Sequence, residues 1–275
     1  AQIEPYYVSL SAMAHLVKAG ARVSSRTAPG IETYLEKIRK ELEPVQSLTR
    51  DITWIGNTNV GSSTDLLQLV MDYVRMSTHI DFLIFNRMVR KVIHNEDHIL
   101  GLIRTMGFLE AMIAVASYRE TVPFYTEGEF VGDDWGIVIK NGYHPLITEP
   151  VANSLDEEKP LLITGSNASG KSTFLRMTAL CALLAQTVAT VHAQQYRAPF
   201  FRIYSSMALR DDIQSAESYF IVEIRSMKRI LDAAQRPGAR IACFVYEELR
   251  GTNTVERIAA SSQILKTLSE KGVFV

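Results

Sequence analysis

One short segment constrains the fold of this chain more than any other. Residues 165–173 read Gly-Ser-Asn-Ala-Ser-Gly-Lys-Ser-Thr, which matches the phosphate-binding pattern G-x-x-x-x-G-K-[ST]. The apolar run Leu161-Leu162-Ile163 precedes it, and a long stretch with helical apolar periodicity follows it. This order predicts a strand at 161–164, a glycine-rich turn and the start of a helix, which is typical of an α/β domain.

The residue types in this segment suit a triphosphate. Glycines at both ends of the turn let successive N–H groups face phosphate oxygens, and the helix N-terminus adds a partial positive charge. Lys171 is expected to reach the β- and γ-phosphates, and Ser172 to offer its hydroxyl to Mg²⁺. The alternative is a Gly/Ser turn with a solvated lysine. We favour a nucleoside triphosphate site formed by Gly165, Ser166, Asn167, Ala168, Ser169, Gly170, Lys171, Ser172 and Thr173.

Composition sets the limits of the remaining hypotheses. The 275 residues are 47% hydrophobic and carry a formal charge of −1, so any nucleic-acid contact has to come from local patches. Cys181 and Cys243 fall in apolar segments without metal-ligand neighbours, which is typical of reduced core residues in an intracellular protein. No signal peptide and no apolar run near 18 residues is apparent. The chain is therefore expected to be soluble and cytoplasmic, without membrane contact.

The apolar pattern divides the chain into two parts. The first part is helical, with one face of a helix at residues 31–42 and further helical patterns at 64–93 and after Asn95. The second part alternates strands with helices, which favours a mostly parallel sheet. We predict an all-α domain over residues 1–124 and an α/β domain over 125–275 that continues past the apolar end at 272–275. Strands are expected at 136–140, 161–164, 200–206, 241–246 and 272–275, and helices at 172–190, 216–235 and 254–270.

Acidic residues follow the apolar strand predicted at 241–245. A phosphate-loop hydrolase needs a carboxylate in the Mg²⁺ shell and another to orient the attacking water. Glu247 and Glu248 stand where ligands bind at the carboxyl end of a parallel strand, although a solvated strand end has the same pattern. Asp211, Asp212 and Ser215 precede the helix predicted at 216–235, where they also suit a helix cap.

Several ordered motifs together resemble the MutS family of DNA mismatch-repair ATPases, which belongs to the wider ABC-type class. Residues 163–176 resemble its phosphate loop, and residues 143–146 its H-P-[LIV] element. Residues 211–223 follow its D-D-[LI]-x-x-G-x-S-T-F-x-x-E motif, and residues 251–254 its G-T-[SN]-T loop. Residues 107–110 resemble part of its helical core, and the similarity spans about residues 95–275.

The resemblance implies an ABC-type ATPase domain that binds ATP and Mg²⁺ and is preceded by a helical lever. Lys171 and Glu247 would be catalytic in cis, Ser172 would contact the metal ion, and Val151 would lie near the adenine. In this family two ATPase domains pair head to tail, so Ser218 would act in trans within an ATP-dependent homodimer. DNA is the partner that the resemblance implies.

The chain departs from the family pattern at three positions. Ala216 replaces the motif glycine and Tyr219 the motif threonine. Counted back from Gly251, the Mg²⁺-shell aspartate falls at Tyr246, although a register with a loop one residue shorter pairs Glu247 with Glu248. A neutral phenol is a poor substitute for a carboxylate beside a divalent cation. We favour the first register, which predicts slow hydrolysis with weak Mg²⁺ dependence.

Two basic clusters and one acidic motif have simpler explanations than DNA recognition. The clusters, at residues 87–91 and 225–229, are more typical of solvated helix faces. Phe108-Leu109-Glu110 matches the F-x-E element of mismatch readers, but it stands in an apolar helical pattern and is expected to pack in the core. DNA binding therefore depends on the resemblance. The clusters comprise Arg87, Arg90 and Lys91, and Arg225, Lys228 and Arg229.

Three functions remain in competition. The first is the ATPase core of a MutS-like DNA-binding protein, in which nucleotide-driven dimerisation is coupled to the helical domain. The second is another ABC-type ATPase, but a transporter domain predicts an LSGGQ motif and a chromosome-maintenance ATPase predicts long heptad arms, and neither is present. The third is a nucleotide-dependent structural switch with little or no hydrolysis, which Tyr246 favours.

Overall fold

The computed structural model describes residues 4–48, 73, 77–78, 80–132, 136–207, 219–236, 238, 240–246 and 253–275. The chain forms two compact units, Ala1–Ala114 and Val115–Val275. The division falls inside a helix, earlier in the chain than the boundary predicted near residue 125. Each unit has its own hydrophobic core.

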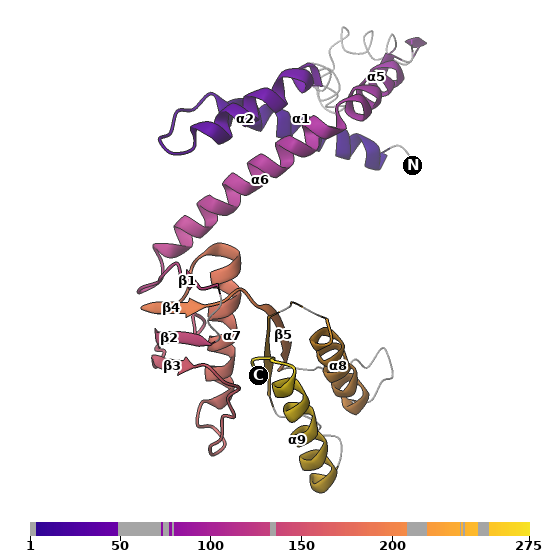
Figure 1. The fold of residues 1–275 in the computed structure, drawn as a ribbon. Coiled ribbons are helices and arrows are strands. Elements are labelled where there is room, and N and C mark those ends of the chain that lie inside the picture. Colours follow the sequence, from indigo (N-terminus) through magenta and orange to yellow (C-terminus); the bar gives the residue numbers. More distant parts are fainter. Residues whose placement is uncertain are drawn as a thin grey trace. The chain divides into compact units, whose positions relative to one another are not determined.

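The first unit is helical in its described residues (Figure 1). It contains α1 (Glu4–Ser24), α2 (Glu32–Leu42), the 3₁₀ turn η1 (Glu43–Val45), α5 (Ile80–His94) and most of α6 (Glu96–Arg119). The predicted helix at 31–42 agrees with α2, whereas residues 64–72 of the next pattern lie outside the described residues. The core of this unit is formed by Val17, Ile38, Leu42, Val45, Leu48, Ile99, Leu102 and Leu109.

A glycine lets α1 and α6 pack closely. A β-carbon at Gly20 would lie 3.1 Å from Leu102 Cδ1 and 3.3 Å from Leu42 Cδ2. The side chain of Leu102 is fully buried at this contact, while its neighbour Ile103 is 45% exposed. The inward face of α6 thus follows the 3.6-residue period through Ile99, Leu102 and Leu109.

Helix α6 also has the length and composition of a membrane span, with a mean hydropathy of 1.8 over 18 residues. Uninterrupted apolar runs in the sequence do not reveal this helix, because Arg104 and Glu110 divide its apolar residues. The similarity of α6 to a membrane span rests on length and composition only. In the structure, Leu102 and Leu109 of this helix are buried in the core of the first unit.

The second unit contains two sheets. The first has the order β1 (Glu129–Phe130), β4 (Gln195–Ala198), β2 (Ile137–Gly142), β3 (Asn153–Glu157). The second pairs β5 (Arg202–Ser206) with β6 (Ile241–Val245) in parallel, and Phe274 extends it through a parallel bridge to Ala242. The remaining elements of this unit are the helices α7 (Lys171–Val188), α8 (Tyr219–Ala234) and α9 (Thr254–Glu270).

Instead of the expected mostly parallel sheet, the structure has a mixed four-stranded sheet, in which β1 and β4 pair in parallel, and the separate parallel pair of β5 and β6. In the same sheet β2 runs antiparallel to both β3 and β4. For β2 and β3 the reason is local, because the loop at 143–152 that joins them is too short for a parallel crossover. The strand predicted at 161–164 is not part of a ladder in the described residues. At its start, the Leu161 N–H donates to the Val275 carbonyl at 2.9 Å.

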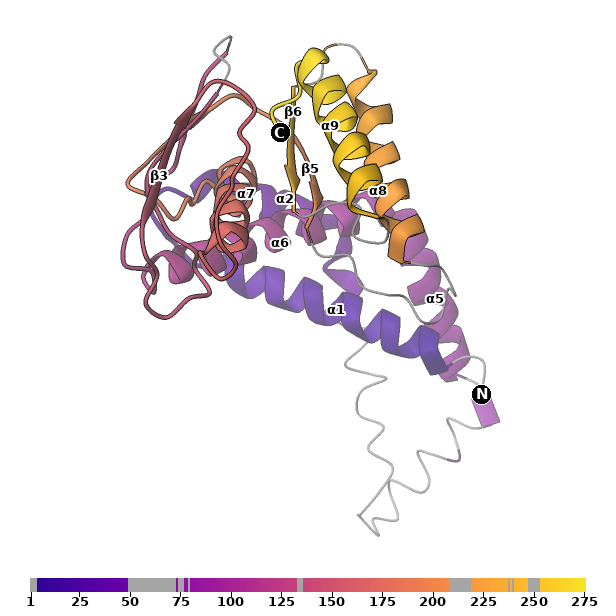
Figure 2. The ribbon, with the colours of Figure 1, turned by 90° about the horizontal axis from the view of Figure 1, so that it is seen from below.

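Helix α7 lies between the two sheets, and α8 and α9 cover the other side of β5 and β6 (Figures 1 and 2). Apart from Met177, the buried face of α7 is made of small side chains, including Cys181, Ala182 and Ala185. Burial among apolar neighbours raises the pKa of the Cys181 thiol to about 12. Small residues let the helix approach both sheets closely, so α7 forms the centre of the second core.

The far end of α7 is held by the last turn of α6. The Arg119 guanidinium donates to the Ala189 carbonyl at 2.7 Å and to Thr190 Oγ1 at 3.0 Å, which places a cation at the C-terminus of α7. Tyr118 Oη lies 2.6 Å from His192 Nε2, and Tyr143 packs edge-on against the same imidazole. All of these residues belong to the second unit.

The buried His192 makes the second unit sensitive to acid. Burial, and to a smaller extent the neighbouring His144, lowers the pKa of His192 below its usual value near 6.5. The unfolded chain therefore binds more protons than the folded one as pH falls through 6.5, and stability is lost in that direction by up to about 1.4 kcal/mol per pH unit. Urea unfolding measured between pH 7.5 and 5 should show that the free energy of unfolding depends less on pH in His192→Gln than in wild type. Equal slopes of this free energy against pH in the two proteins would contradict this account.

Two adjacent residues of α6 offer a matched test of the first core. Leu102→Ala should lower the free energy of unfolding by about 2–5 kcal/mol, because Leu102 is fully buried and its truncation would leave an enclosed cavity in the core. Ile103→Ala, on the exposed side, should lower it by less than about 1 kcal/mol. Urea denaturation followed by circular dichroism measures both, and equal losses would contradict the packing of α6.

Candidate functional site

The glycine-rich turn at 165–170 leads directly into α7, which begins at Lys171. Gly170, at the N-cap, has φ +89°, a left-handed conformation that favours glycine. A β-carbon at Gly165 would lie only 3.1 Å from Ser169 Oγ, so the two ends of the turn approach closely. The backbone conformation at Gly170 and the close approach at Gly165 therefore explain why both positions are glycine.

The lysine of the motif folds back onto its own turn. Lys171 Nζ donates to the carbonyl of Gly165 at 2.9 Å and to that of Ser166 at 2.6 Å. Residues 164–170 are exposed, whereas Ser172 and Thr173 are half-buried in the first turn of α7. A cation, an exposed turn and a helix N-terminus thus meet at one point, which is an arrangement suited to an anion.

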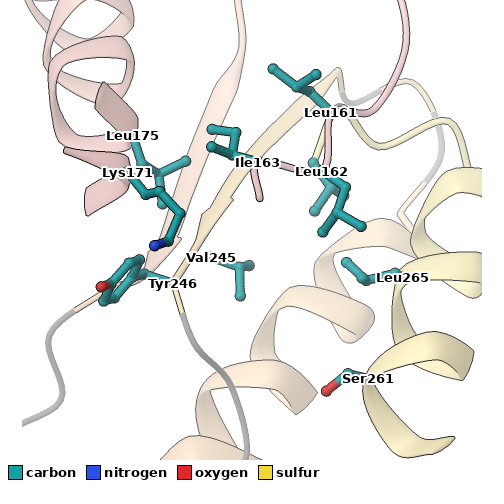
Figure 3. Close-up of a pocket in the computed structure, with 10 residues that line it drawn as sticks. Leu161, Leu162, Ile163, Lys171, Leu175, Val245, Tyr246, Ser261 and Leu265 are labelled. Carbon is teal, nitrogen blue, oxygen red and sulfur yellow. The ribbon is translucent and has the colours of Figure 1, made fainter. Parts of the chain in front are cut away.

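A cavity of about 260 Å³ lies beside this lysine (Figure 3). Its walls come from residues 161–163, from α7, from the end of β6, from α9 and from Val275. Figure 3 shows the ring of Tyr246 next to the Lys171 ammonium group. Tyr246 follows β6 directly, and its backbone N–H donates to the Ser206 carbonyl at 2.9 Å. The position of Tyr246 is therefore fixed by the pairing of β5 with β6.

The structure brings together some of the predicted site residues. Lys171 and Tyr246 line the same cavity, and Lys171 is the member of the predicted set 165–173 that does so. Val151 is 81% exposed in the loop between β2 and β3 and does not line that cavity. Glu247 and Ser218, together with Asp211, Asp212, Ala216 and Glu248, lie outside the described residues.

Sequence reasoning missed the apolar walls of the cavity. Leu175, Ser261 and Leu265 contribute to it from α7 and α9. In the sequence these residues follow ordinary helical periodicity, which predicts an inward face but not a space left open there. Only the positions of the two helices relative to β6 could have revealed them.

Few of the described side chains could bind a metal ion at this site. Across the part of the chain that the structure describes, no group of three or more His, Cys, Asp or Glu side chains could hold a metal ion. The hydroxyls among the residues that line the cavity belong to Tyr246 and Ser261, and Ser172 follows Lys171 in the first turn of α7. A phenol at this point offers one neutral oxygen where a carboxylate would offer charge.

Comparison with known proteins places this site in a family. Residues 161–274 match the family model for MutS domain V. The chain is 27% identical over 259 residues to the DNA mismatch repair protein MSH3 of Debaryomyces hansenii, a match that covers 87% of this chain and 25% of the relative. It is 30% identical over 213 residues to the DNA mismatch repair protein MutS of Lactobacillus delbrueckii subsp. bulgaricus, covering 74% and 24% respectively.

A third relative comes from a mammal. MutS protein homolog 4 of Mus musculus is 28% identical over 231 residues, covering 79% of this chain and 23% of the relative. The chain thus spans about a quarter of the length of these relatives. The matched region contains the glycine-rich turn and also α7, β6 and α9, which contribute walls of the cavity. The chain belongs to the MutS family, and residues 161–274 are its domain V.

Proposed function

We propose that this chain is the ATP-binding and slowly hydrolysing core of a MutS-like DNA-binding protein of the mismatch-repair type, built on an ABC-type phosphate-loop domain. The observation that supports this most strongly is the position of Lys171. Its ammonium group is held by the carbonyls of Gly165 and Ser166 at the N-terminus of α7, where an anion would be stabilised. The family membership of residues 161–274 supports the same assignment.

Binding of the triphosphate would exchange partners at this turn. Phosphate oxygens would replace the two carbonyls as acceptors for Lys171, and charge-assisted hydrogen bonds of this kind are stronger than those to neutral acceptors. The N–H groups of residues 166–170 and the α7 dipole would hold the remaining oxygens. Ser172 would offer its hydroxyl to Mg²⁺, which neutralises phosphate charge when bound. The exposed Val151 would be available to the base.

Hydrolysis and assembly require residues beyond this turn. We assign Glu247 to orienting the attacking water and Ser218 to the γ-phosphate of a second copy, so that ATP joins two ATPase domains as a homodimer. Helix α6 is continuous from the first unit into the second, and its end at Arg119 is tied to the end of α7. Nucleotide-driven pairing would thereby reach the helical domain, and through it DNA.

A second candidate function has an observation of its own. Tyr246 lines the cavity beside Lys171, at the end of the strand where a hydrolase needs a carboxylate. A chain that binds ATP there without useful hydrolysis would act as a nucleotide-dependent structural switch that recruits partners. The two candidates share the binding step and differ in turnover.

Removal of the lysine tests the binding step. Lys171→Ala should weaken ATP binding about 10- to 100-fold, because it deletes hydrogen bonds from a charged donor worth roughly 1.5–3 kcal/mol. Isothermal titration calorimetry of both proteins measures the change. Lys159→Ala removes an exposed lysine from the loop after β3 and should leave the affinity unchanged. Equal heats in wild type and Lys171→Ala would exclude the proposed site.

Replacement of Tyr246 tests the hydrolysis step. Tyr246→Asp supplies the missing carboxylate and should raise Mg²⁺-dependent phosphate release by about tenfold or more. Tyr246→Phe, which removes only the hydroxyl, should not. If wild type releases phosphate no faster than Lys171→Ala although it binds ATP, the structural switch is the correct function. If Tyr246→Asp shows no gain, Tyr246 does not occupy the metal-shell position.

A further inference from the structure

The cavity beside Lys171 and the turn that would hold a triphosphate are separate spaces. Of residues 165–173, Lys171 lines the cavity, so the rest of the turn is not part of its walls. The turn itself is exposed at residues 164–170. A triphosphate held by the turn therefore does not account for the cavity, and the two spaces share one side chain.

The walls of the cavity are apolar and incompletely covered. Most of the lining residues are Leu, Ile or Val, from residues 161–163, α7, β6, α9 and the last residue of the chain. Leu175, Val245 and Leu265 are half-buried, and Leu162 is 76% exposed. Apolar surface of this kind is stabilised when an apolar group displaces water from it. An uncharged body therefore suits these walls, whereas a triphosphate does not.

The positive charge at the cavity belongs to Lys171. No acidic side chain is present among the described residues that line the cavity. Lys171 Nζ donates to the carbonyls of Gly165 and Ser166, which are neutral acceptors. An ammonium group has three N–H donors, so one is left for a further acceptor. The described lining is therefore complementary to a ligand with one anionic group.

The volume of the cavity limits the size of this ligand. An apolar cavity of about 150 Å³ binds benzene, and the cavity beside Lys171 has a volume of about 260 Å³. It has room for one aromatic ring and a short arm, and a long acyl chain exceeds it. Tyr246 adds an aromatic ring to the wall, against which a second ring can pack.

We propose that this cavity binds an aromatic carboxylate, with its ring against the apolar walls and its carboxylate on Lys171. A hydrogen bond between an ammonium group and a carboxylate is charge-assisted and stronger than one to a neutral acceptor. This site goes beyond the ATP-binding function proposed for the turn, and only its effect on ATP rests on that function.

Such a ligand would hold Lys171 away from a triphosphate. A carboxylate in the cavity can accept the third N–H of Lys171 and leave its bonds to the Gly165 and Ser166 carbonyls in place. A triphosphate has to take the ammonium group from those carbonyls. The two ligands therefore oppose each other, and linkage requires each to weaken the other by the same factor. ATP binding would thus be sensitive to small aromatic acids.

Hydrocinnamate is a suitable probe, because it joins one phenyl ring to a carboxylate through a short arm. Saturation-transfer NMR with the full chain should show that it binds with a roughly millimolar Kd, as expected for a ligand of so few atoms. Hydrocinnamamide has the same shape without the charge and should bind about tenfold more weakly or worse. Equal affinities of the acid and the amide would exclude Lys171 as the anchor and overturn the proposal.

Two adjacent serines of α9 provide matched variants. Ser261 lines the cavity, whereas Ser262 is exposed and does not line it. Ser261→Phe should fill the cavity and abolish the hydrocinnamate signal, and Ser262→Phe should keep the wild-type signal. Thermal unfolding within a few degrees of wild type verifies that both variants fold. Equal signals in the two variants would place the acid elsewhere and overturn the assignment to this cavity.

Calorimetry with ATP tests the effect on the turn. Hydrocinnamate at about ten times its own Kd should weaken ATP binding about tenfold in wild type and in Ser262→Phe, but not in Ser261→Phe. Unchanged ATP affinity in wild type, although the acid binds, would overturn the competition. If wild type binds ATP but not hydrocinnamate, the proposed cavity ligand is wrong and the ATP function stands. If it binds hydrocinnamate but not ATP, the function proposed for the turn fails and the cavity ligand stands.

Discussion

The second unit depends on how a glycine-rich turn enters a helix. Gly170 takes a left-handed conformation at the N-cap of α7, and the next residue, Lys171, turns back to bond the Gly165 and Ser166 carbonyls. The turn is therefore joined to a buried helix at its end, and the Lys171 ammonium group binds the carbonyls at its start. The wall of the cavity formed by Tyr246 comes from a different source, the pairing of β5 with β6, and meets the turn at Lys171.

Helix α7 carries that turn into the core. Its small buried residues contact a mixed sheet on one side and a parallel pair on the other, so the helix cannot shift without disturbing both sheets. Arg119 holds the opposite end through the Ala189 carbonyl. A helix fixed at both ends and packed along its length provides a rigid support for a lysine that has to meet a charged ligand.

The sequence indicated local elements well where side-chain chemistry was specific. The helix predicted at 254–270 agrees with α9, since Asn253 Oδ1 accepts the Glu256 N–H at 2.9 Å as an N-cap. The family assignment also followed from motifs at defined separations, and the domain V match confirms it. For the first helix, α1, the sequence predicted only a helical domain over residues 1–124, without bounds for this helix.

Long-range geometry was not accessible in the same way. Whether β2 pairs in parallel or antiparallel depends on which strand lies beside it, and periodicity carries no such information. The cavity beside Lys171 and the contact of Tyr118 with His192 join residues far apart in the chain. Residue types alone therefore do not reveal such contacts, because the contacts depend on how the fold brings distant residues together.

The burial of Cys181 in the middle of α7 has a chemical consequence. Its thiol, with a pKa of about 12, stays protonated at neutral pH, and alkylating reagents attack the thiolate. Iodoacetamide can therefore modify this position only in molecules whose central helix has left the sheets. The rate of that modification therefore measures how often the domain opens. A ligand that stabilises the turn at the N-terminus of α7 would lower this rate.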